Sequence, residues 1–177
     1  MPGTMPMRHD AVLVDRVARL NARYRHHGAT SVLKQALSDS EVGRIALVSS
    51  FGAESVVLLH LISVMDRSVP VLFIDTEMLF AETLAYQIEL TERLHLKDLQ
   101  IVRADRAQVF VRDTEGLLHQ YDPDACCALR KTEPLQRALA GFDAWITGRK
   151  RYQGAQRADL DFFEADGDRR IKVNPLV

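Results

Sequence analysis

Short apolar runs alternate with segments of helical periodicity along most of this chain. Runs typical of buried strands occupy 44–50, 69–75, 99–105 and 144–148. Predicted helices fall between them: 56–65 is apolar nearly all round, as in a buried helix, and 80–94 and 109–118 read as further helical stretches. Strands and helices that alternate at this distance predict an α/β fold with a mostly parallel, twisted sheet covered by helices on both faces. Without an internal repeat or a low-complexity linker, we expect a single domain over residues 1–177.

Residues 1–40 precede the alternation and are predicted to be helical. Their apolar residues recur at spacings of four, three and four, which is one face of a helix: Leu13, Val17, Leu20 and Tyr24. Gly28 interrupts this pattern, and we expect Thr30 or Ser31 to cap a short second helix. The sequence therefore predicts N-terminal helices that pack on the α/β domain.

The charge balance excludes several classes of partner. The 23 Lys and Arg residues almost match the 24 Asp and Glu residues, so we expect neither a nucleic acid nor a membrane as partner. The N-terminus lacks the apolar core of a signal peptide, because Arg8, His9 and Asp10 interrupt it. The only cysteines, Cys126 and Cys127, are adjacent and so poorly placed to bridge each other. These features predict a reduced, cytoplasmic protein.

A serine-rich loop follows the first predicted strand. It has the sequence SSFGAES and runs from Ser49 to Ser55. Parallel sheets bind ligands at the carboxyl ends of their strands, where helix N-termini present free N–H groups. Gly52 would let a phosphate approach the backbone, and the serine hydroxyls could donate to it. No Gly-Lys-Ser/Thr follows, which excludes an ordinary P-loop; a serine-capped turn explains the loop equally well.

The second predicted strand ends in Asp75 and Thr76, at the same edge of the sheet as the serine loop. These side chains could hold a ribose or orient a phosphate. The alternative is that Thr76 only caps the helix that follows. Beside the serine loop, we favour a role in binding.

The adjacent cysteines lie near the predicted start of a helix, with Asp122 as its cap and Pro123 in the first turn. A helix N-terminus, Arg130 and Lys131 would all favour thiolates, and thiolates bind metals or iron–sulfur clusters. Two small buried residues are the alternative. Two cysteines supply half of a four-thiolate cluster, and no histidine has the spacing of a zinc finger.

A basic loop follows the fourth predicted strand. It begins at Gly148 and contains four cations: Arg149, Lys150, Arg151 and Arg157. A run of charge is often only a solvated loop. At the ligand edge of the sheet, however, it could clamp a doubly anionic group, and we favour that interpretation.

These segments, in this order, resemble the sulfonucleotide reductases of sulfate assimilation. The matching stretches are SSFGAES at 49–55, FIDTEMLFAET at 73–83, DPDACCALRKTEPLQRAL at 122–139, GFDAWITGRKRYQGAQRA at 141–158 and KVNPL at 172–176. The resemblance spans roughly residue 40 to the end and implies a fold of the adenine nucleotide alpha hydrolase (PP-loop) type. The double cysteine resembles the iron–sulfur branch, which reduces adenylyl sulfate rather than its 3′-phosphorylated form.

The resemblance also implies roles for particular residues. The substrate would be cradled by Ser49, Ser50, Phe51, Gly52, Ala53 and Ser55, and Asp75 and Thr76 would contact the nucleotide. Cys126 and Cys127 would ligate a [4Fe–4S] cluster, and Lys131 would lie between cluster and substrate. The phosphosulfate would be bound by Arg149, Arg151 and Arg157.

The chain departs from this family in two ways. Glu77 stands where the family usually has glycine, and its carboxylate would oppose an anionic ligand if it pointed inward. The family also continues past KVNPL to a second cysteine pair and a catalytic cysteine, neither of which this chain contains. In the family that cysteine attacks the sulfate sulfur, AMP departs, and a thiol of thioredoxin or glutaredoxin releases sulfite. We therefore expect these residues to be the substrate- and cluster-binding part of an adenylyl-sulfate reductase, lacking the catalytic tail.

Three alternatives stay open. One is a phosphoadenylyl-sulfate reductase, and another is an adenylating ATP pyrophosphatase or ATP-sulfurylase subunit. The latter usually carries Ser-Gly-Gly-x-Asp-Ser where this chain has Ser-Phe-Gly-Ala-Glu-Ser, and it would leave the cysteine pair unexplained. The third is an inactive nucleotide-binding remnant. The sequence leaves open whether the protein forms homo-oligomers.

Overall fold

Two compact units make up the structure, which is a computed structural model. It describes residues 7–148, 160–167 and 169–177. The first unit comprises Met1–Leu47 and Phe142–Val177, and the second comprises Val48–Gly141. The chain therefore leaves the first unit within its first strand and returns to it after a long central segment. The single nucleotide-binding domain expected from the sequence stays a prediction.

The first unit holds a mixed set of paired strands. In the order in which they pair, these are β1 (Ile45–Ser49), β4 (Ala144–Ile146), β6 (Arg170–Val173) and β5 (Phe163–Asp166). The pairs β1–β4 and β4–β6 are parallel, with Ile45 opposite Ala144 and Ala144 opposite Ile171. The predicted parallel pairing is therefore confirmed. Strand β5 departs from it, because it runs antiparallel to β6.

Strands β5 and β6 form a hairpin that the sequence analysis missed. The turn contains Gly167, whose φ of +66° is a left-handed conformation that glycine adopts without strain. The indole N–H of Trp145 on β4 donates to the Asp166 carboxylate at 2.8 Å. The Lys172 ammonium lies 5.2 Å from the centre of the same indole ring. An Asp-Gly turn between short strands was the signal available in the sequence.

Helices α1 (Met7–Tyr24) and α2 (Ala29–Ala36) confirm the predicted N-terminal helical segment. The side chain of Asn21 fixes α1 to the start of β5: it donates to the Phe163 carbonyl at 2.8 Å and accepts from the Phe163 N–H at 2.9 Å. The predicted cap of α2 was wrong. Gly28, with extended backbone, takes the N-cap position without a side-chain hydrogen bond, so the helix begins before Thr30 and Ser31.

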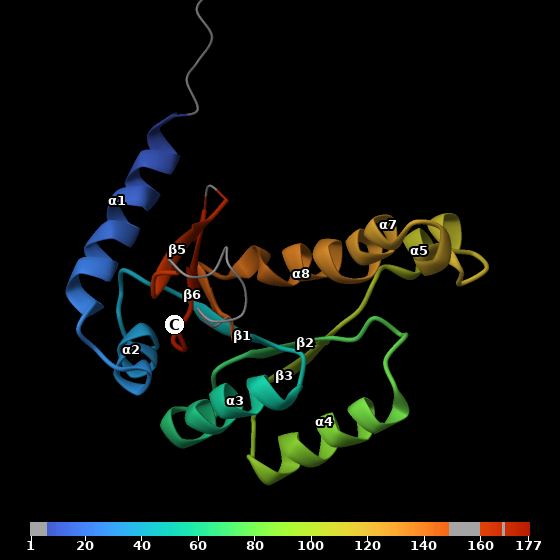
Figure 1. The fold of residues 1–177 in the computed structure, drawn as a ribbon, viewed down its shortest axis with the longest axis horizontal. Coiled ribbons are helices and arrows are strands. Elements are labelled where there is room, and N and C mark those ends of the chain that lie inside the picture. The colour runs from blue at the N-terminus through green and yellow to red at the C-terminus, as the bar shows by residue number, and fades with distance from the viewer. Residues whose placement is uncertain (1–6, 149–159, 168) are drawn as a thin grey trace, which may run out of the picture. The chain divides into compact units, whose positions relative to one another are not determined.

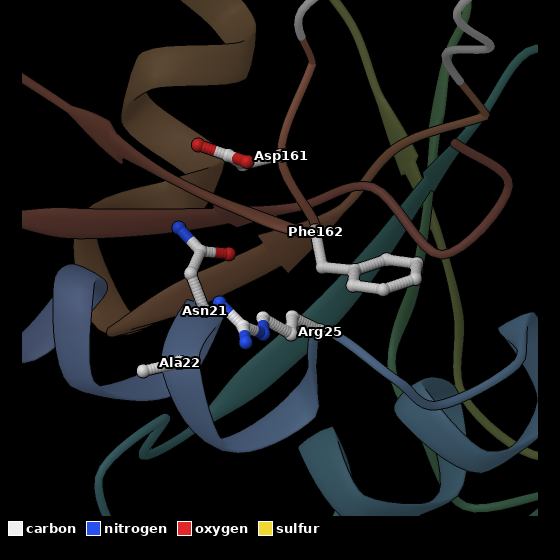
Figure 2. A pocket seen from close by; sticks show the side chains of 5 residues that line it. All are labelled: Asn21, Ala22, Arg25, Asp161 and Phe162. Atoms are coloured by element: carbon white, nitrogen blue, oxygen red, sulfur yellow. The ribbon is translucent and has the colours of Figure 1, made fainter.

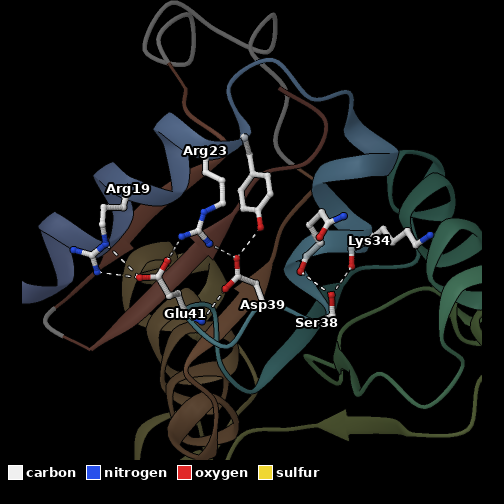
Figure 3. Close-up of polar contacts among 8 residues, drawn as sticks. Arg19, Arg23, Lys34, Ser38, Asp39 and Glu41 are labelled. Carbon is white, nitrogen blue, oxygen red and sulfur yellow. Dashed lines mark hydrogen bonds and ion pairs between the residues drawn. The ribbon is translucent and has the colours of Figure 1, made fainter.

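Figure 3 shows a charged cluster that joins α1 to the segment after α2. Arg23 donates to Asp39 at 2.9 Å and to Glu41 at 2.7 Å, and the Tyr24 hydroxyl donates to Asp39 at 2.7 Å. Burial by itself raises the pKa of the Asp39 carboxyl. The hydrogen bonds from Tyr24 and from the Glu41 backbone N–H, together with Arg23, outweigh it and lower this pKa overall. The cluster is therefore strongest when Asp39 is ionised.

The second unit consists of two parallel strands and their covering helices. Its first elements are α3 (Ala53–Met65), β2 (Val71–Ile74), α4 (Ala81–Arg93) and β3 (Leu99–Val102). Strands β2 and β3 are parallel, with Val71 opposite Leu99. Helices α3 and α4 lie on one side of this pair, and α8 lies on the other (Figure 1). The unit therefore has the predicted arrangement of strands covered by helices on both faces.

The helical stretch predicted over 109–118 is instead two short helices. Helix α5 (Arg106–Arg112) ends at Asp113, and helix α6 (Leu118–Tyr121) begins after a turn that contains Gly116 at a φ of +70°. The Asp113 carboxylate accepts the Leu118 N–H at 2.9 Å, which closes that turn. The prediction failed because the apolar spacing continues across the turn and so suggests one helix. Gly116, in a left-handed conformation, ends that helix.

One nearly continuous helical rod follows and carries the cysteine pair. It consists of α7 (Pro123–Cys127), a π turn (Ala128–Thr132), α8 (Glu133–Ala138) and a 3₁₀ turn (Leu139–Gly141). As predicted, Asp122 caps α7 by accepting the Ala125 N–H at 2.9 Å, and Pro123 lies in the first turn. Pro134 has no N–H to give to the carbonyl of Arg130, so the regular ladder is interrupted there. The π turn lies where this α-helical bond is missing.

Within the described residues, no helix is both long enough and apolar enough to cross a bilayer.

Acid should weaken the attachment of α1. A carboxyl whose pKa is lowered by folding stabilises the fold fully above its unfolded pKa of about 4, and this stability is lost as pH falls through the folded pKa. In Asp39→Asn, the free energy of unfolding near neutral pH should fall by about 1–3 kcal/mol. The difference from wild type should shrink as the pH falls below the unfolded pKa of about 4 and through the lower folded pKa. Thermal unfolding across this pH range measures both effects.

The matched control is Glu89→Gln on α4. Glu89 forms an exposed ion pair with Arg93, so its loss should change the free energy of unfolding by less than about 1 kcal/mol. A deficit of Asp39→Asn that is as large at acid pH as at neutral pH would contradict the role assigned to the ionised carboxylate.

Candidate functional site

The serine-rich loop after β1 is held by its own hydroxyls. The Ser49 Oγ accepts the Phe51 N–H at 3.1 Å, and the Ser50 Oγ accepts the Gly52 N–H at 3.4 Å. The Ser50 and Ser55 hydroxyls lie 3.4 Å apart. Ser49 is buried, whereas Ser50 is exposed. The loop therefore combines a fixed backbone with an exposed hydroxyl.

Phe51 gives this loop its sharp bend. Its φ of +56° is left-handed, a conformation that disfavours a residue with a large side chain. The buried Phe51 ring packs edge-to-face on Phe73 of β2, with 5.3 Å between ring centres, and this contact holds the bend. Helix α3 begins directly afterwards, with Gly52 as its N-cap and no side-chain cap.

The loop after β2 is built around Asp75, which is buried. One of its carboxylate oxygens accepts the Glu77 N–H at 2.9 Å, and the other accepts from Arg103 Nε at 2.9 Å. The neighbouring Thr76 hydroxyl accepts the Met78 N–H at 3.3 Å. Both predicted binding residues thus also hold the loop together, and their direct contact with a nucleotide stays a prediction.

Glu77, where the resemblance leads one to expect glycine, has a φ of +60°. This left-handed conformation accounts for a preference for glycine at the position. The Glu77 carboxylate lies 3.7 Å from Nη1 of Arg130. It lines a cavity of about 250 Å³ together with Arg106, Phe110 and Asp113. Glu77 is therefore paired with a cation rather than directed at the serine-rich loop.

A separate cavity of about 380 Å³ lies where β1 and β2 end, entirely within the second unit. Its lining residues are Val48, Ser49, Ser50, Phe73, Ile74, Thr76, Leu79, Lys131, Thr132 and Leu135. The volume falls in the range of about 300–1,000 Å³ that is usual for small-molecule sites. Among these lining residues, Lys131 is the cation, and there is no carboxylate. The cavity thus brings together predicted residues from the serine-rich loop, the β2 loop and the cysteine segment.

The helical rod has two distinct sides beside this cavity. Cys126, Arg130 and Pro134 recur every four residues and are buried. Cys127 and Lys131 are exposed and also four residues apart, so they lie on a common side of the rod. Lys131 faces the cavity, and Arg130 does not line it.

Arg130 was expected to favour thiolates at the cysteine pair, but its positive charge is matched by acidic groups. Its guanidinium donates to Asp113 at 2.8 Å and 3.3 Å and to the Thr76 carbonyl at 3.0 Å. The hydrogen bonds from Arg130, aided by the Leu118 N–H, lower the pKa of the Asp113 carboxyl, although burial opposes them. Asp113 was not identified from the sequence. A carboxylate at the end of a short helix gave no signal that its partner lay 17 residues away.

The cysteine pair does not by itself fit a complete four-thiolate cluster. Cys126 is buried and Cys127 is exposed, and neither forms a disulfide. In the described part of the chain, no three His, Cys, Asp or Glu side chains form a group that could hold a metal. The sequence contains two cysteines, which is half of the donor set.

The cations of the basic loop fall outside the described residues. The predicted contact of Arg149, Arg151 and Arg157 with an anion therefore stays a prediction.

A further cavity, of about 270 Å³, lies in the first unit and contains none of the predicted residues. Figure 2 shows its lining: Asn21, Ala22, Arg25, Asp161 and Phe162. Both polar ends of the Asn21 amide are bonded to the backbone of Phe163. This cavity therefore borders a contact that anchors α1.

Sequence comparison identifies relatives over most of the chain. It is 45% identical over 159 residues to the adenosine 5′-phosphosulfate reductase of Chelativorans sp. (strain BNC1), covering 89% of this chain and 64% of that protein. It is also 45% identical over 162 residues to the protein of that name from Mesorhizobium japonicum, covering 92% of this chain and 63% of the relative. The chain thus spans slightly less than two thirds of the length of these relatives.

Structural comparison supports the fold. The crystal structure of phosphoadenylyl-sulfate (PAPS) reductase from Candida auris, a phosphate complex, matches with a TM-score of 0.75 at 23% identity. The match covers 99% of this chain and 82% of the other. Residues 44–177 match the phosphoadenosine phosphosulfate reductase domain, and the chain belongs to that family.

Proposed function

We propose that these residues form the substrate-binding part of an adenylyl-sulfate reductase, which converts adenosine 5′-phosphosulfate to sulfite and AMP. The observation that carries this proposal is the cavity that joins Ser49, Ser50 and Thr76 to Lys131. The names of the two relatives at 45% identity support the choice of reaction. The relatives named for this substrate are longer than the part that this chain matches, so the substrate is proposed for a protein of that length.

The cavity suits an adenine nucleotide because its walls differ in character. Phe73, Ile74 and Leu135 offer apolar surface to a base, while Ser50 and Lys131 offer donors to a phosphosulfate. Helix α3 starts beside Ser50 and presents its N-terminal dipole there. The hydrogen bonds of an anion to Ser50 and Lys131 would be charge-assisted and therefore strong.

Gly52 supports a close approach of the anion to the backbone. A Cβ at this position would lie 3.4 Å from the Ser50 hydroxyl, an ordinary contact. Its φ of −72° is open to any residue. The position therefore has room for a side chain, and glycine leaves that space open to an anion. The neighbouring Ala53 would contribute its backbone N–H and Ser55 its hydroxyl to the same cradle, while Phe51, whose N–H is bonded to Ser49, would keep the loop in shape.

The reaction requires a thiolate to attack the sulfate sulfur while the bond from that sulfur to the phosphate oxygen breaks. AMP takes the bonding electrons as it leaves, and a second thiol then releases sulfite and forms a disulfide. In this scheme Lys131 and the Ser50 hydroxyl stabilise the negative charge on the departing phosphate. Arg149, Arg151 and Arg157 would hold the sulfate end, and Asp75 and Thr76 would contact the nucleotide.

Adenylyl sulfate is favoured over its 3′-phosphorylated form as the substrate. Relatives at 45% identity carry the adenosine 5′-phosphosulfate name, whereas a phosphoadenosine 5′-phosphosulfate reductase from Alkalilimnicola ehrlichii is 38% identical over 140 residues.

Cys126 and Cys127 would supply two of the four thiolates of a [4Fe–4S] cluster, with the other two from outside these residues. The exposed thiol of Cys127 lies on the side of the rod that carries Lys131, which supports a cluster beside the substrate. Free thiols and a thioredoxin or glutaredoxin reductant both suit the reducing cytoplasm, which we propose as the compartment.

Loss of a cavity donor should weaken binding of AMP. Lys131→Ala and Ser50→Ala should each lower the affinity measured by calorimetry, by about 1–3 kcal/mol for the charged group and about 0.5–1.5 kcal/mol for the hydroxyl. The control Lys97→Ala removes an exposed lysine of the same unit that does not line the cavity, and it should bind as wild type does. Wild-type affinity in both cavity variants would contradict the site.

The 177-residue chain should not hold a stable cluster or turn over substrate. Its two thiols are half of the ligands that a cluster needs. Neither of them is the thiol that we expect to attack the sulfate sulfur. Anaerobic reconstitution with iron and sulfide, followed by iron analysis, measures the first expectation. Incubation with labelled adenylyl sulfate and thioredoxin, followed by detection of sulfite, measures the second. A brown protein with a stoichiometric cluster, or sulfite released over many turnovers, would contradict them.

Activity of the protein as the cell makes it distinguishes the proposed enzyme from an inactive remnant. A reductase that contains this chain should form sulfite and AMP in equal amounts. A full-length protein that binds AMP but forms no sulfite, with thioredoxin present and its iron intact, would favour the remnant.

A further inference from the structure

Arg130 is a buried cation that none of the proposed binding contacts uses. Its side chain is 8% exposed. Nε and Nη2 donate to the same oxygen of Asp113, at 3.3 Å and 2.8 Å, and Nη1 donates to the Thr76 carbonyl at 3.0 Å. Glu77 adds a carboxylate at 3.7 Å. The guanidinium is therefore satisfied by groups from two other segments of the second unit.

These contacts join three segments that are distant in sequence. Asp113 ends α5, Thr76 follows β2, and Arg130 lies in the π turn of the helical rod. The Asp113 side chain is 1% exposed, so the ion pair is shielded from solvent. A buried, hydrogen-bonded pair of this kind is far more demanding in geometry than an exposed one.

Two of the three joined segments contribute to the wall of the cavity. Thr76 lines it directly, and Lys131, the next residue after Arg130, lines it from the helical rod. Because consecutive helical residues point in different directions, Arg130 can face the interior while Lys131 faces the cavity. The position of Arg130 therefore determines where Lys131 lies relative to Thr76.

We propose that Arg130 is a positioning residue, which acts by holding the Thr76 carbonyl and the Asp113 carboxylate. These contacts fix the position of the helical rod, so that its side with Cys127 and Lys131 faces the strand ends with Ser50 and Thr76. This role rests on the proposed function, since it concerns the same cavity. Arginine suits this role because its planar guanidinium donates to two acceptors at once. A lysine ammonium on a flexible side chain does not.

Thiol labelling tests the positioning without any nucleotide. In a Cys127→Ser background, Cys126 is the sole thiol, and it lies on the buried side of the rod, four residues before Arg130. Arg130→Lys keeps the charge but loses one of the two attachments. The rate at which a thiol-specific dye labels Cys126 should then rise roughly tenfold, as expected for the loss of a buried charge-assisted hydrogen bond.

The matched control is Arg112→Lys in the same background. Arg112 joins α5 to α8 through Glu133 at 2.9 Å, but this pair is partly exposed and does not contact Thr76. Its labelling rate should stay within about twofold of wild type. Equal labelling rates in Arg130→Lys and Arg112→Lys would overturn the proposal.

A second measurement, the affinity for AMP, distinguishes a positioning role of Arg130 from a general loss of fold stability. At a temperature where all variants are folded, Arg130→Lys should bind AMP roughly five- to tenfold more weakly. Leu90→Ala, a core change in α4, should lower the melting temperature but leave the affinity unchanged. Equal losses of affinity in both would overturn the proposal. If the wild-type chain binds no AMP, the proposed function fails while the labelling still decides the role of Arg130.

Asp113→Asn keeps the test decisive if Arg130→Lys does not fold. The asparagine preserves the shape and the acceptor for the Leu118 N–H but removes the charge that Arg130 faces. It should accelerate labelling of Cys126 by a similar factor, and the double variant should add little, since both changes break one unit. Wild-type labelling in Asp113→Asn, or full additivity in the double variant, would overturn the proposal.

Discussion

The buried ion pair between Arg130 and Asp113 is the constraint on which the second unit's cavity depends. A charge taken out of water must be paired and hydrogen-bonded, and here the partner carboxylate is itself fixed by the Leu118 N–H. The guanidinium uses its remaining donors on the backbone of Thr76. One side chain thereby holds the π turn, the end of α5 and the loop after β2. The positions of these segments fix the positions of the residues in the cavity wall.

Local conformation in the two loops serves the same arrangement. Phe51 and Glu77 both adopt left-handed backbone, at φ values of +56° and +60°. Phe51 is anchored by the ring of Phe73, and Glu77 lies beside Arg130. Strained residues persist only where surrounding contacts favour them, and they concentrate at functional sites. Their presence at the ends of β1 and β2 fits a ligand edge of the kind that parallel sheets use.

Most elements were predictable because their signals are local. The apolar runs gave β1 to β4 to within two or three residues, and Asp122 with Pro123 gave the start of α7. The two short helices around Gly116 and the β5–β6 hairpin were missed, since one continues an apolar spacing across a turn and the other consists of short strands rich in charge. The helix predicted over 80–94 is α4, and its buried residues are Gln87 and Leu90.

The sequence by itself determined the order of β1 to β4 and the main helices between them, the serine-rich loop, the cysteine pair and Lys131, because periodicity and side-chain chemistry act over neighbouring residues. Only the tertiary structure decided which of these residues share a cavity and which carry structural charge. Arg130 and Lys131 are adjacent in sequence and chemically alike, but one is buried against Asp113 and the other faces the cavity. That division depends on a carboxylate 17 residues away and on the π turn at Ala128–Thr132. Packing between distant segments is the property that local patterns do not encode.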